Sequence, residues 1–301
     1  MQPTPSYPIG TPGQPWGDAE RDQWRARQVR QRSYADDVLT AIEALRGRFD
    51  VELYGDVVYA NDQHPAERFP LRAIRSRNWQ PGLPSVLITG GVHGYETSGV
   101  HGALRFVDTQ AERFAGRANL LVVPCVSPWA YERFQRWNFD AIDPNRSFKE
   151  GSSAQESLAL MRLVAQHQGQ YGQFTAHIDL HETTDTDESE YRPAVAARDG
   201  KVFEPGSIPD GFYLVDDTEH PQPAFQRAIV AAVERVTHIA EADQEAQGDQ
   251  HADRYAVTER RLHAYDQILR FGRDVEVIAP PELRQRIAQE LTATAKKYAD
   301  G

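Results

Sequence analysis

The hydrophobic pattern of this chain alternates between short apolar runs and longer periodic stretches. A Val-Leu-Ile run at 86–88 ends in two glycines, and residues 174–183 contain a second apolar strand pattern. Alternation in the second run puts Ile178 and Leu180 on one face of the strand. Strands that alternate with helical stretches predict an α/β fold, in which a mostly parallel, mixed central sheet is flanked by helices.

The other predicted elements follow from the same periodicities. They are a long helix over about 18–48, short strands near 51–53 and 57–59, strand-helix alternation over 86–168, a strand over 212–215 and a helix over 223–239. The proline-rich residues 1–17 precede them as an extended arm.

A histidine and a glutamate three positions apart follow the first apolar strand. Imidazole nitrogen and carboxylate oxygen are ligands that suit Zn²⁺. The spacing alone has little weight, because it recurs at His64/Glu67 and at His238/Glu241. His93 and Glu96 differ from these pairs in lying on a strand-to-helix turn, where open α/β sheets place their ligands. We therefore predict His93 and Glu96 as metal ligands, and the other pairs as surface or packing residues.

A third ligand is expected at the end of another apolar strand, because a catalytic zinc ion takes three protein ligands and a water. His181, at the carboxyl end of the strand in 174–183, is the predicted third ligand. His177 lies deeper on the same face and is interpreted as a buried, hydrogen-bonded histidine. Asp179 or Asp143 could accept the second ring N–H of a ligand histidine and so fix its tautomer.

A loop-rich region between these two strands supplies arginines and an asparagine. It contains Arg133, Arg136 and the sequence Asp-Pro-Asn-Arg at 143–146. A guanidinium group matches a carboxylate with two parallel hydrogen bonds, and a fixed cation can stabilise a developing oxyanion. Taken alone, the region is weak evidence, because arginines in loops are usually solvated.

The order of the three motifs makes the pattern specific. HxxE, then DxNR, then a strand that ends in DLHET resembles the zinc carboxypeptidase superfamily, which includes the succinylglutamate desuccinylase and aspartoacylase branch. The lines SPWAYERFQRWNFDAIDPNRSF and IDLHETTDTDESEYRPAVAARDG are most similar to a bacterial group of small metallocarboxypeptidases. The resemblance extends from about Tyr7 to about Ala240, and it implies a single zinc ion held by His93, Glu96 and His181.

The resemblance also implies roles for other residues. Asn145 and Arg146 match the pair that grips the terminal carboxylate of the substrate. Arg136 matches the arginine that polarises the carbonyl group, with Arg133 as second choice because the spacing before DxNR varies. Asp143 matches the acid that orients the first zinc histidine. The general base is expected at Glu259, where a fragment of the family's Thr-Thr-Glu context remains; an ordinary helix-surface residue is the alternative there.

The C-terminal residues depart from this family. Residues 269–283 and the helix after them resemble the C-terminal extension of WYL-domain transcription regulators, with a strand followed by a helix. Leu283, Ile287 and Leu291 recur every four residues and form an apolar stripe that packs. The predicted organisation is therefore an arm (1–17), a zinc carboxypeptidase-like catalytic domain (18–250) and a short atypical α+β segment (251–301).

The amino-acid composition limits the kinds of partner that this chain is expected to bind. The formal net charge of -11, from 44 acidic side chains against 33 Lys and Arg, argues against nucleic-acid binding. The arginine-rich run 25–32 is interpreted as the solvated face of a helix. Cys125, the single cysteine, excludes an intramolecular disulfide and is predicted to be inert core. No signal-like N-terminus and no stretch of about eighteen apolar residues is found, so we expect a cytoplasmic protein without a membrane partner.

The resemblance implies a zinc metallocarboxypeptidase that hydrolyses the C-terminal peptide bond of peptides. A zinc-dependent deacylase of N-acyl amino acids is the closest alternative, since it uses the same ligands. A catalytically impaired zinc-binding homologue is another. A transcription regulator, which the WYL-like tail suggests, lacks a recognisable helix-turn-helix pattern. The sequence leaves substrate side-chain preference and oligomeric state open.

Overall fold

The computed structural model describes residues 7–215 and 221–240, and the chain divides into two compact units. The first unit contains Met1–Glu182 and Glu190–Glu204, and the second contains Thr183–Ser189 and Pro205–Gly301. Every strand found among the described residues belongs to the first unit. The domain boundaries predicted at residues 17 and 250 remain predictions.

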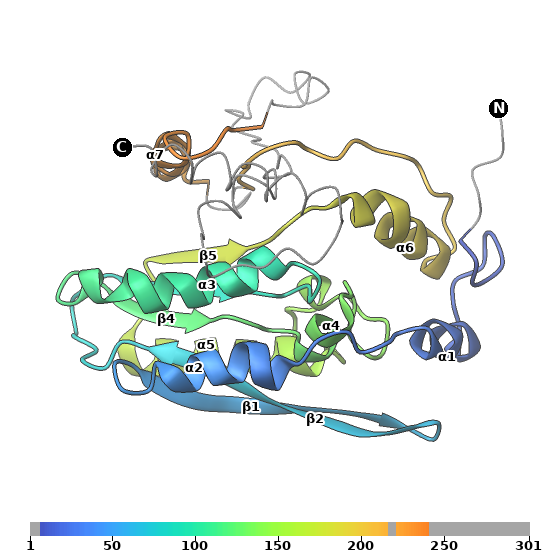
Figure 1. Cartoon of the computed structure of the whole chain (residues 1–301), viewed down its shortest axis with the longest axis horizontal. Coiled ribbons are helices and arrows are strands. Elements are labelled where there is room, and N and C mark those ends of the chain that lie inside the picture. Colours follow the sequence, from blue (N-terminus) through green and yellow to red (C-terminus); the bar gives the residue numbers. More distant parts are fainter. Residues whose placement is uncertain (1–6, 216–220, 241–301) are drawn as a thin grey trace, which may run out of the picture. The chain divides into compact units, whose positions relative to one another are not determined.

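A five-stranded sheet forms the centre of the first unit, with strand order β1-β2-β4-β3-β5 (Figure 1). The strands are β1 (Asp50–Asn61), β2 (His64–Arg75), β3 (Ser85–Gly90), β4 (Asn119–Val123) and β5 (Ala176–Leu180). β2 pairs antiparallel with β1 and β4, whereas β3 pairs parallel with β4 and β5. The expected mixed sheet with helical cover is confirmed, and its parallel part is the part that carries the candidate ligands.

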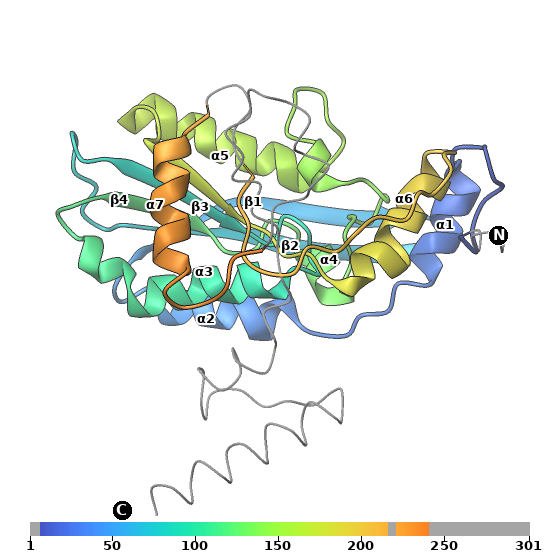
Figure 2. The same cartoon turned by 90° about the horizontal axis from the view of Figure 1, so that it is seen from above.

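Helices cover both faces of this sheet. Figure 2 shows α5 on one side of the strands and α2 and α3 on the other. Alternation along β4 explains this arrangement: Leu120 and Val122 belong to the core cluster that includes α3, and Leu121 and Val123 to the cluster that includes α5. The helical segments are α1 (Asp18–Ala26), η1 (Ala35–Leu39), α2 (Thr40–Ala44), α3 (Thr97–Thr109), η2 (Ala111–Phe114), α4 (Pro128–Arg133), η3 (Pro144–Arg146), α5 (Gln155–Tyr171), η4 (Asp187–Tyr191), α6 (Arg192–Arg198) and α7 (Pro223–Val233).

The predicted long helix over 18–48 is wrong. The structure has α1, then a stretch without helix, then η1 and α2. In the stretch between them, the backbone N–H groups of Gln31 and Arg32 donate to the carbonyl oxygen of Glu132 instead of continuing a helical ladder. The run 25–32 is also not a solvated helix face, because Arg25 is only 7% exposed and donates from Nε to the carbonyl oxygen of Phe139 at 2.8 Å.

The elements predicted near residues 50–60 and in the second unit also need correction. The two short strands near 51–53 and 57–59 are one strand, β1, which continues through an irregularity between Leu53 and Gly55. Its partner β2 was not predicted. In the second unit, Phe212 forms only an isolated bridge with Ile239, and α7 ends at Val233, short of the predicted end of the helix. The predicted segment 251–301 lies outside the described residues.

A buried carboxyl group lies in the core of the first unit. Glu156 on α5 is 1% exposed, and its Oε2 accepts a hydrogen bond from Tyr59 Oη at 2.5 Å. Burial raises the pKa of Glu156 above its ordinary value of 4.5. The neutral form of this side chain is therefore the one that the fold prefers.

Replacing Glu156 by glutamine is expected to make stability less sensitive to alkaline pH. A folded pKa above the unfolded value contributes stability that is fully present below pH 4.5 and is lost as the pH rises through the folded pKa. The melting temperature of Glu156→Gln should therefore gain on that of the parent between pH 5 and pH 8. Thermal unfolding at both pH values measures this, with the exposed Glu150→Gln as control. A constant difference between the two proteins across this range would contradict the interpretation.

Candidate metal centre

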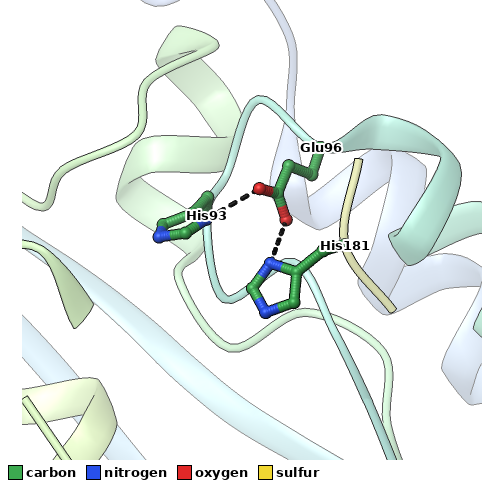
Figure 3. Close-up of side chains that lie close together, drawn as sticks. All are labelled: His93, Glu96 and His181. Atoms are coloured by element: carbon green, nitrogen blue, oxygen red, sulfur yellow. Dashed lines mark hydrogen bonds and ion pairs between the residues drawn. The ribbon is translucent and has the colours of Figure 1, made fainter. Parts of the chain in front are cut away.

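The predicted ligands meet because β3 and β5 are parallel neighbours. Gly90, the last residue of β3, is paired with Leu180, the last residue of β5. The turn that carries His93 and Glu96 and the residue His181 therefore leave the sheet side by side at its carboxyl edge (Figure 3). Glycine is required in this turn at Gly91, which has φ +60° and where a Cβ would come within 2.6 Å of Val100 Cγ2.

The three side chains converge on one point. His93 Nδ1 lies 2.7 Å from Glu96 Oε1, and His181 Nδ1 lies 2.8 Å from Glu96 Oε2 (Figure 3). One ligand atom from each residue lies within 4.8 Å of the others. His93 and Glu96 are each 2% exposed, whereas the His181 side chain is 31% exposed, so the group opens to solvent on the His181 side. Two imidazole nitrogens and a carboxylate are a donor set that suits a zinc ion.

A second carboxylate holds the other side of each ring. His93 Nε2 lies 3.0 Å from Asp143 Oδ1, and His181 Nε2 lies 2.7 Å from Asp179 Oδ2. Carboxylates in this position fix the tautomer and the orientation of a metal-binding histidine. Asp143 and Asp179, which the sequence analysis offered as alternatives, thus serve one histidine each, and both leave Nδ1 directed at Glu96.

The charges of this cluster shift its protonation. Burial lowers the pKa of His181, but hydrogen bonds with Asp179 and Glu96 and the charges of these carboxylates raise it overall to about 10. Burial also lowers the pKa of His93, but the charge of Glu96 and the hydrogen bonds to Asp143 and Glu96 raise this pKa overall. Burial would raise the pKa of Asp143, and the His93 hydrogen bond and charge hold it well below its usual range. A metal ion at this site competes with protons for the ring nitrogens.

The loop after β4 brings the polar groups of the DxNR motif to the same centre. Asp143 is the N-cap of η3 and accepts from the backbone N–H of Asn145 at 3.0 Å. Arg136 Nε donates to Asp143 Oδ2 at 3.2 Å, which ties Arg136 to the acid behind His93. Arg146 is exposed, and no carboxylate of the described residues lies within ion-pair distance of it. The loop thus holds one arginine against the centre and leaves another open to solvent.

Arg133, the second choice for the polarising arginine, is committed elsewhere. Its guanidinium donates to both carboxylate oxygens of Glu67, at 2.7 and 2.8 Å, and lies over the ring of Trp129. Glu67 therefore belongs to an ion pair and not to a metal site. Its HxxE partner His64 contacts Asn61 through Nδ1 at 2.9 Å. Of the remaining predictions, Glu241 and Glu259 lie outside the described residues.

Three observations beside the centre were not anticipated. His177 is exposed rather than buried, although it is hydrogen-bonded as expected, with its Nε2 at 2.8 Å from Thr89 Oγ1. Tyr95, between the first two ligands, has its hydroxyl 3.4 Å from Arg136 Nη1. Its position inside the HxxE spacing is a signal that could have identified it. Arg32 contacts the same turn from far along the chain, where the sequence gives no comparable signal.

Comparison with known proteins supports a family resemblance for part of the chain. Residues 82–204 match the succinylglutamate desuccinylase/aspartoacylase catalytic domain, and residues 225–295 match the WCX domain, in agreement with the predicted WYL-like tail. Among curated proteins, none matches the sequence.

Solved structures give matches of limited extent. One is a candidate metallopeptidase from Shewanella denitrificans, with 21% identity, 70% of this chain and 68% of that chain covered, and a TM-score of 0.49. Another is a metallo-carboxypeptidase from Pseudomonas aeruginosa, with 21% identity, 49% and 39% coverage and a TM-score of 0.34. A third is an aspartoacylase family protein from Mesorhizobium loti, with 27% identity, 44% and 40% coverage and a TM-score of 0.32.

No helix among the described residues combines the length and the hydropathy that a membrane crossing requires.

The family match and the geometry concern the same residues, because His93, Glu96 and His181 all lie within the matched range. Residues 82–204 of this chain therefore resemble the succinylglutamate desuccinylase/aspartoacylase catalytic domain, as the order of the three motifs predicted.

Proposed function

We propose that this protein is a zinc-dependent metallocarboxypeptidase that hydrolyses the C-terminal peptide bond of peptides. One observation carries the proposal. Two histidines present Nδ1 to the two oxygens of a shared, buried glutamate, while a separate aspartate holds each Nε2. Structural ion pairs do not need this double arrangement, whereas outer carboxylates of this kind are a regular feature of histidine-liganded metal sites.

The donor set fits zinc and supports a hydrolytic role. His93, Glu96 and His181 would hold the ion, since three protein ligands leave a position for water. When bound, zinc would supply Lewis acidity and bring the pKa of its water to about 7. The exposed side of His181 gives a substrate access to this centre.

The other roles belong to the chain's own residues. Arg136, held at 3.2 Å from Asp143, donates hydrogen bonds to the oxygen on which charge develops during attack on the carbonyl. Asn145 and the exposed Arg146 bind the free carboxylate of the substrate. Glu259 is the proposed base that accepts the proton of the attacking water.

A second candidate function is the deacylation of N-acyl amino acids. The match of residues 82–204 to the desuccinylase/aspartoacylase catalytic domain favours it. The same three ligands and the same carboxylate-binding pair serve either reaction, because both substrates present an amide carbonyl and a free carboxylate. The difference lies in the leaving amine and the acyl group, which other parts of the protein must recognise.

A third candidate is a zinc-binding protein with impaired catalysis. The match to the WCX domain covers residues 225–295 and therefore includes Glu259. A segment of this kind, which packs rather than catalyses, would leave the centre without its base.

Metal analysis together with substrate assays is expected to decide between these functions. We expect the purified protein to contain zinc and to release the C-terminal residue from peptides with a free carboxylate. The same peptides with an amidated C-terminus are the matched control, and they should resist cleavage because Arg146 has no carboxylate to bind. Turnover of N-succinylglutamate or another N-acyl amino acid, without turnover of peptides, would replace the first proposal by the second. Bound zinc without turnover of either class would indicate the impaired homologue.

A further inference from the structure

The stretch between α1 and η1 is fastened to one residue of α4. The Glu132 carbonyl accepts from the backbone N–H of Gln31 at 2.8 Å, and its buried carboxylate accepts from the N–H of Tyr34 at 2.9 Å and from Arg30 at 2.8 Å. Arg32, at the centre of this stretch, thus has its backbone fixed against α4. Its side chain is placed by this anchoring and not by a helix of its own.

The Arg32 guanidinium makes three hydrogen bonds in different directions. It donates from Nε to the Tyr131 carbonyl at 2.6 Å, from Nη1 to Thr97 Oγ1 at 2.7 Å and from Nη2 to the Gly94 carbonyl at 2.7 Å. It also lies over two aromatic rings, 3.5 Å from the centroid of Tyr131 and 3.8 Å from that of Phe134. These partners belong to α4, to the residue after it, to the turn that carries two of the candidate ligands and to Thr97, the first residue of α3.

That turn packs directly on α4. A Cβ on Gly94 would come within 2.0 Å of the Ala130 carbonyl carbon and of the Tyr131 nitrogen, so the two backbones are in contact. The two residues that Arg32 holds, Gly94 and Thr97, enclose Tyr95 and Glu96. Arg32 therefore ties both ends of the segment that contains Glu96 to the helix beneath it.

We propose that Arg32 is a positioning residue, which holds the turn from His93 to Thr97 in the geometry that binds the metal. This inference rests on the proposed function, since it presupposes that His93, Glu96 and His181 bind a metal ion. Arg32 makes its hydrogen bonds to Tyr131, Thr97 and Gly94, and not to the donor atoms of the candidate ligands. It acts by fixing the backbone from which His93 and Glu96 project.

The chemistry of the contact requires arginine. A guanidinium carries five N–H donors in a rigid plane and can stack on aromatic rings while it donates at its edge. A lysine at this place would keep the charge but has a single nitrogen, which cannot reach a carbonyl on α4, a hydroxyl and a carbonyl on the turn together. Lysine is therefore a sharp test, because it separates geometry from charge.

The experiment measures zinc binding by the metal-free full-length protein. Arg32→Lys and Arg32→Met are compared with the parent and with Arg27→Met, which removes an exposed arginine of the same stretch. Competition with a chromophoric chelator gives the zinc affinity, and the visible absorption of the cobalt-substituted protein reports the ligand geometry. Both Arg32 variants are expected to bind zinc about 10- to 100-fold more weakly, as when outer partners of metal ligands are lost. Their cobalt spectra should change, and that of Arg27→Met should not.

The outcomes separate this inference from the proposed function. A parent protein that binds no zinc refutes both. If the parent binds zinc, and Arg32→Lys and Arg32→Met both have the zinc affinity and the cobalt spectrum of the parent, only the positioning role of Arg32 is refuted. If the Arg32 variants do not fold, Thr97→Val is compared with Thr97→Ser, because valine removes one acceptor of Arg32 together with the bond from Thr97 Oγ1 to the Tyr95 carbonyl, and serine keeps both. Equal zinc affinity of this second pair would then overturn the inference.

Discussion

Replacing His181 by alanine is expected to abolish zinc binding and hydrolysis together. The substitution removes one of three ligands and leaves Glu96 Oε2 and Asp179 Oδ2 without the ring that lies between them, at 2.8 and 2.7 Å. Two negative groups would then face each other across a partly exposed gap. The fall in zinc affinity should exceed the about 10- to 100-fold loss that follows removal of an outer partner. Chelator competition and peptide turnover measure the two effects on the same preparation.

His64→Ala is the matched control for this prediction. His64 and Glu67 repeat the HxxE spacing of His93 and Glu96, but His64 contacts Asn61, and Glu67 binds Arg133. The control variant is expected to bind zinc as the parent does. If His181→Ala binds zinc tightly and keeps full activity, the metal is held elsewhere, and the proposed active site is wrong.

The cluster of candidate ligands could be predicted from the sequence because its members follow strongly patterned strands. An apolar run that ends in glycines fixes where β3 stops, and alternation in 174–183 fixes which residue follows β5. Parallel neighbours bring their carboxyl ends together, so the two strand ends were sufficient to bring His93, Glu96 and His181 into one cluster. The strand pairing itself, and with it the distance between the ligands, needed the structure.

Other parts could not be predicted because long-range contacts decide them. The stretch after α1 has helical periodicity, yet Glu132, about a hundred residues later, takes up its backbone donors. Strand β2 contains Pro65 and Pro70 and was missed, although Phe69, Leu71 and Ala73 alternate as buried residues. Its pairing with β1 outweighs the local signal of the prolines. Arg32 and Arg25 were assigned to solvent for the same reason, since no local pattern shows which carbonyl groups they reach.

Replacing Arg136 by glutamine is expected to lower kcat far more than it changes KM. A donor that stabilises the oxyanion acts in the transition state, and loss of one such donor typically costs about 100- to 1000-fold in kcat. Arg136 also donates to Asp143 at 3.2 Å, so zinc content must be checked in the variant. A fully metallated Arg136→Gln protein with a low kcat would assign the loss to the arginine itself.

Arg146→Gln is the contrasting variant, because Arg146 is exposed and the proposal gives it a role in binding only. A hydrogen bond to a charged group contributes about 1.5–3 kcal/mol, which corresponds to a rise of about 10- to 150-fold in KM. Its kcat should stay near that of the parent, since the carboxylate of the substrate does not change charge during the reaction. Steady-state kinetics of both variants on one peptide with a free C-terminus therefore test the two roles against each other. A reversed pattern, with Arg146→Gln lowering kcat and Arg136→Gln raising KM alone, would mean that the two arginines had been given each other's roles.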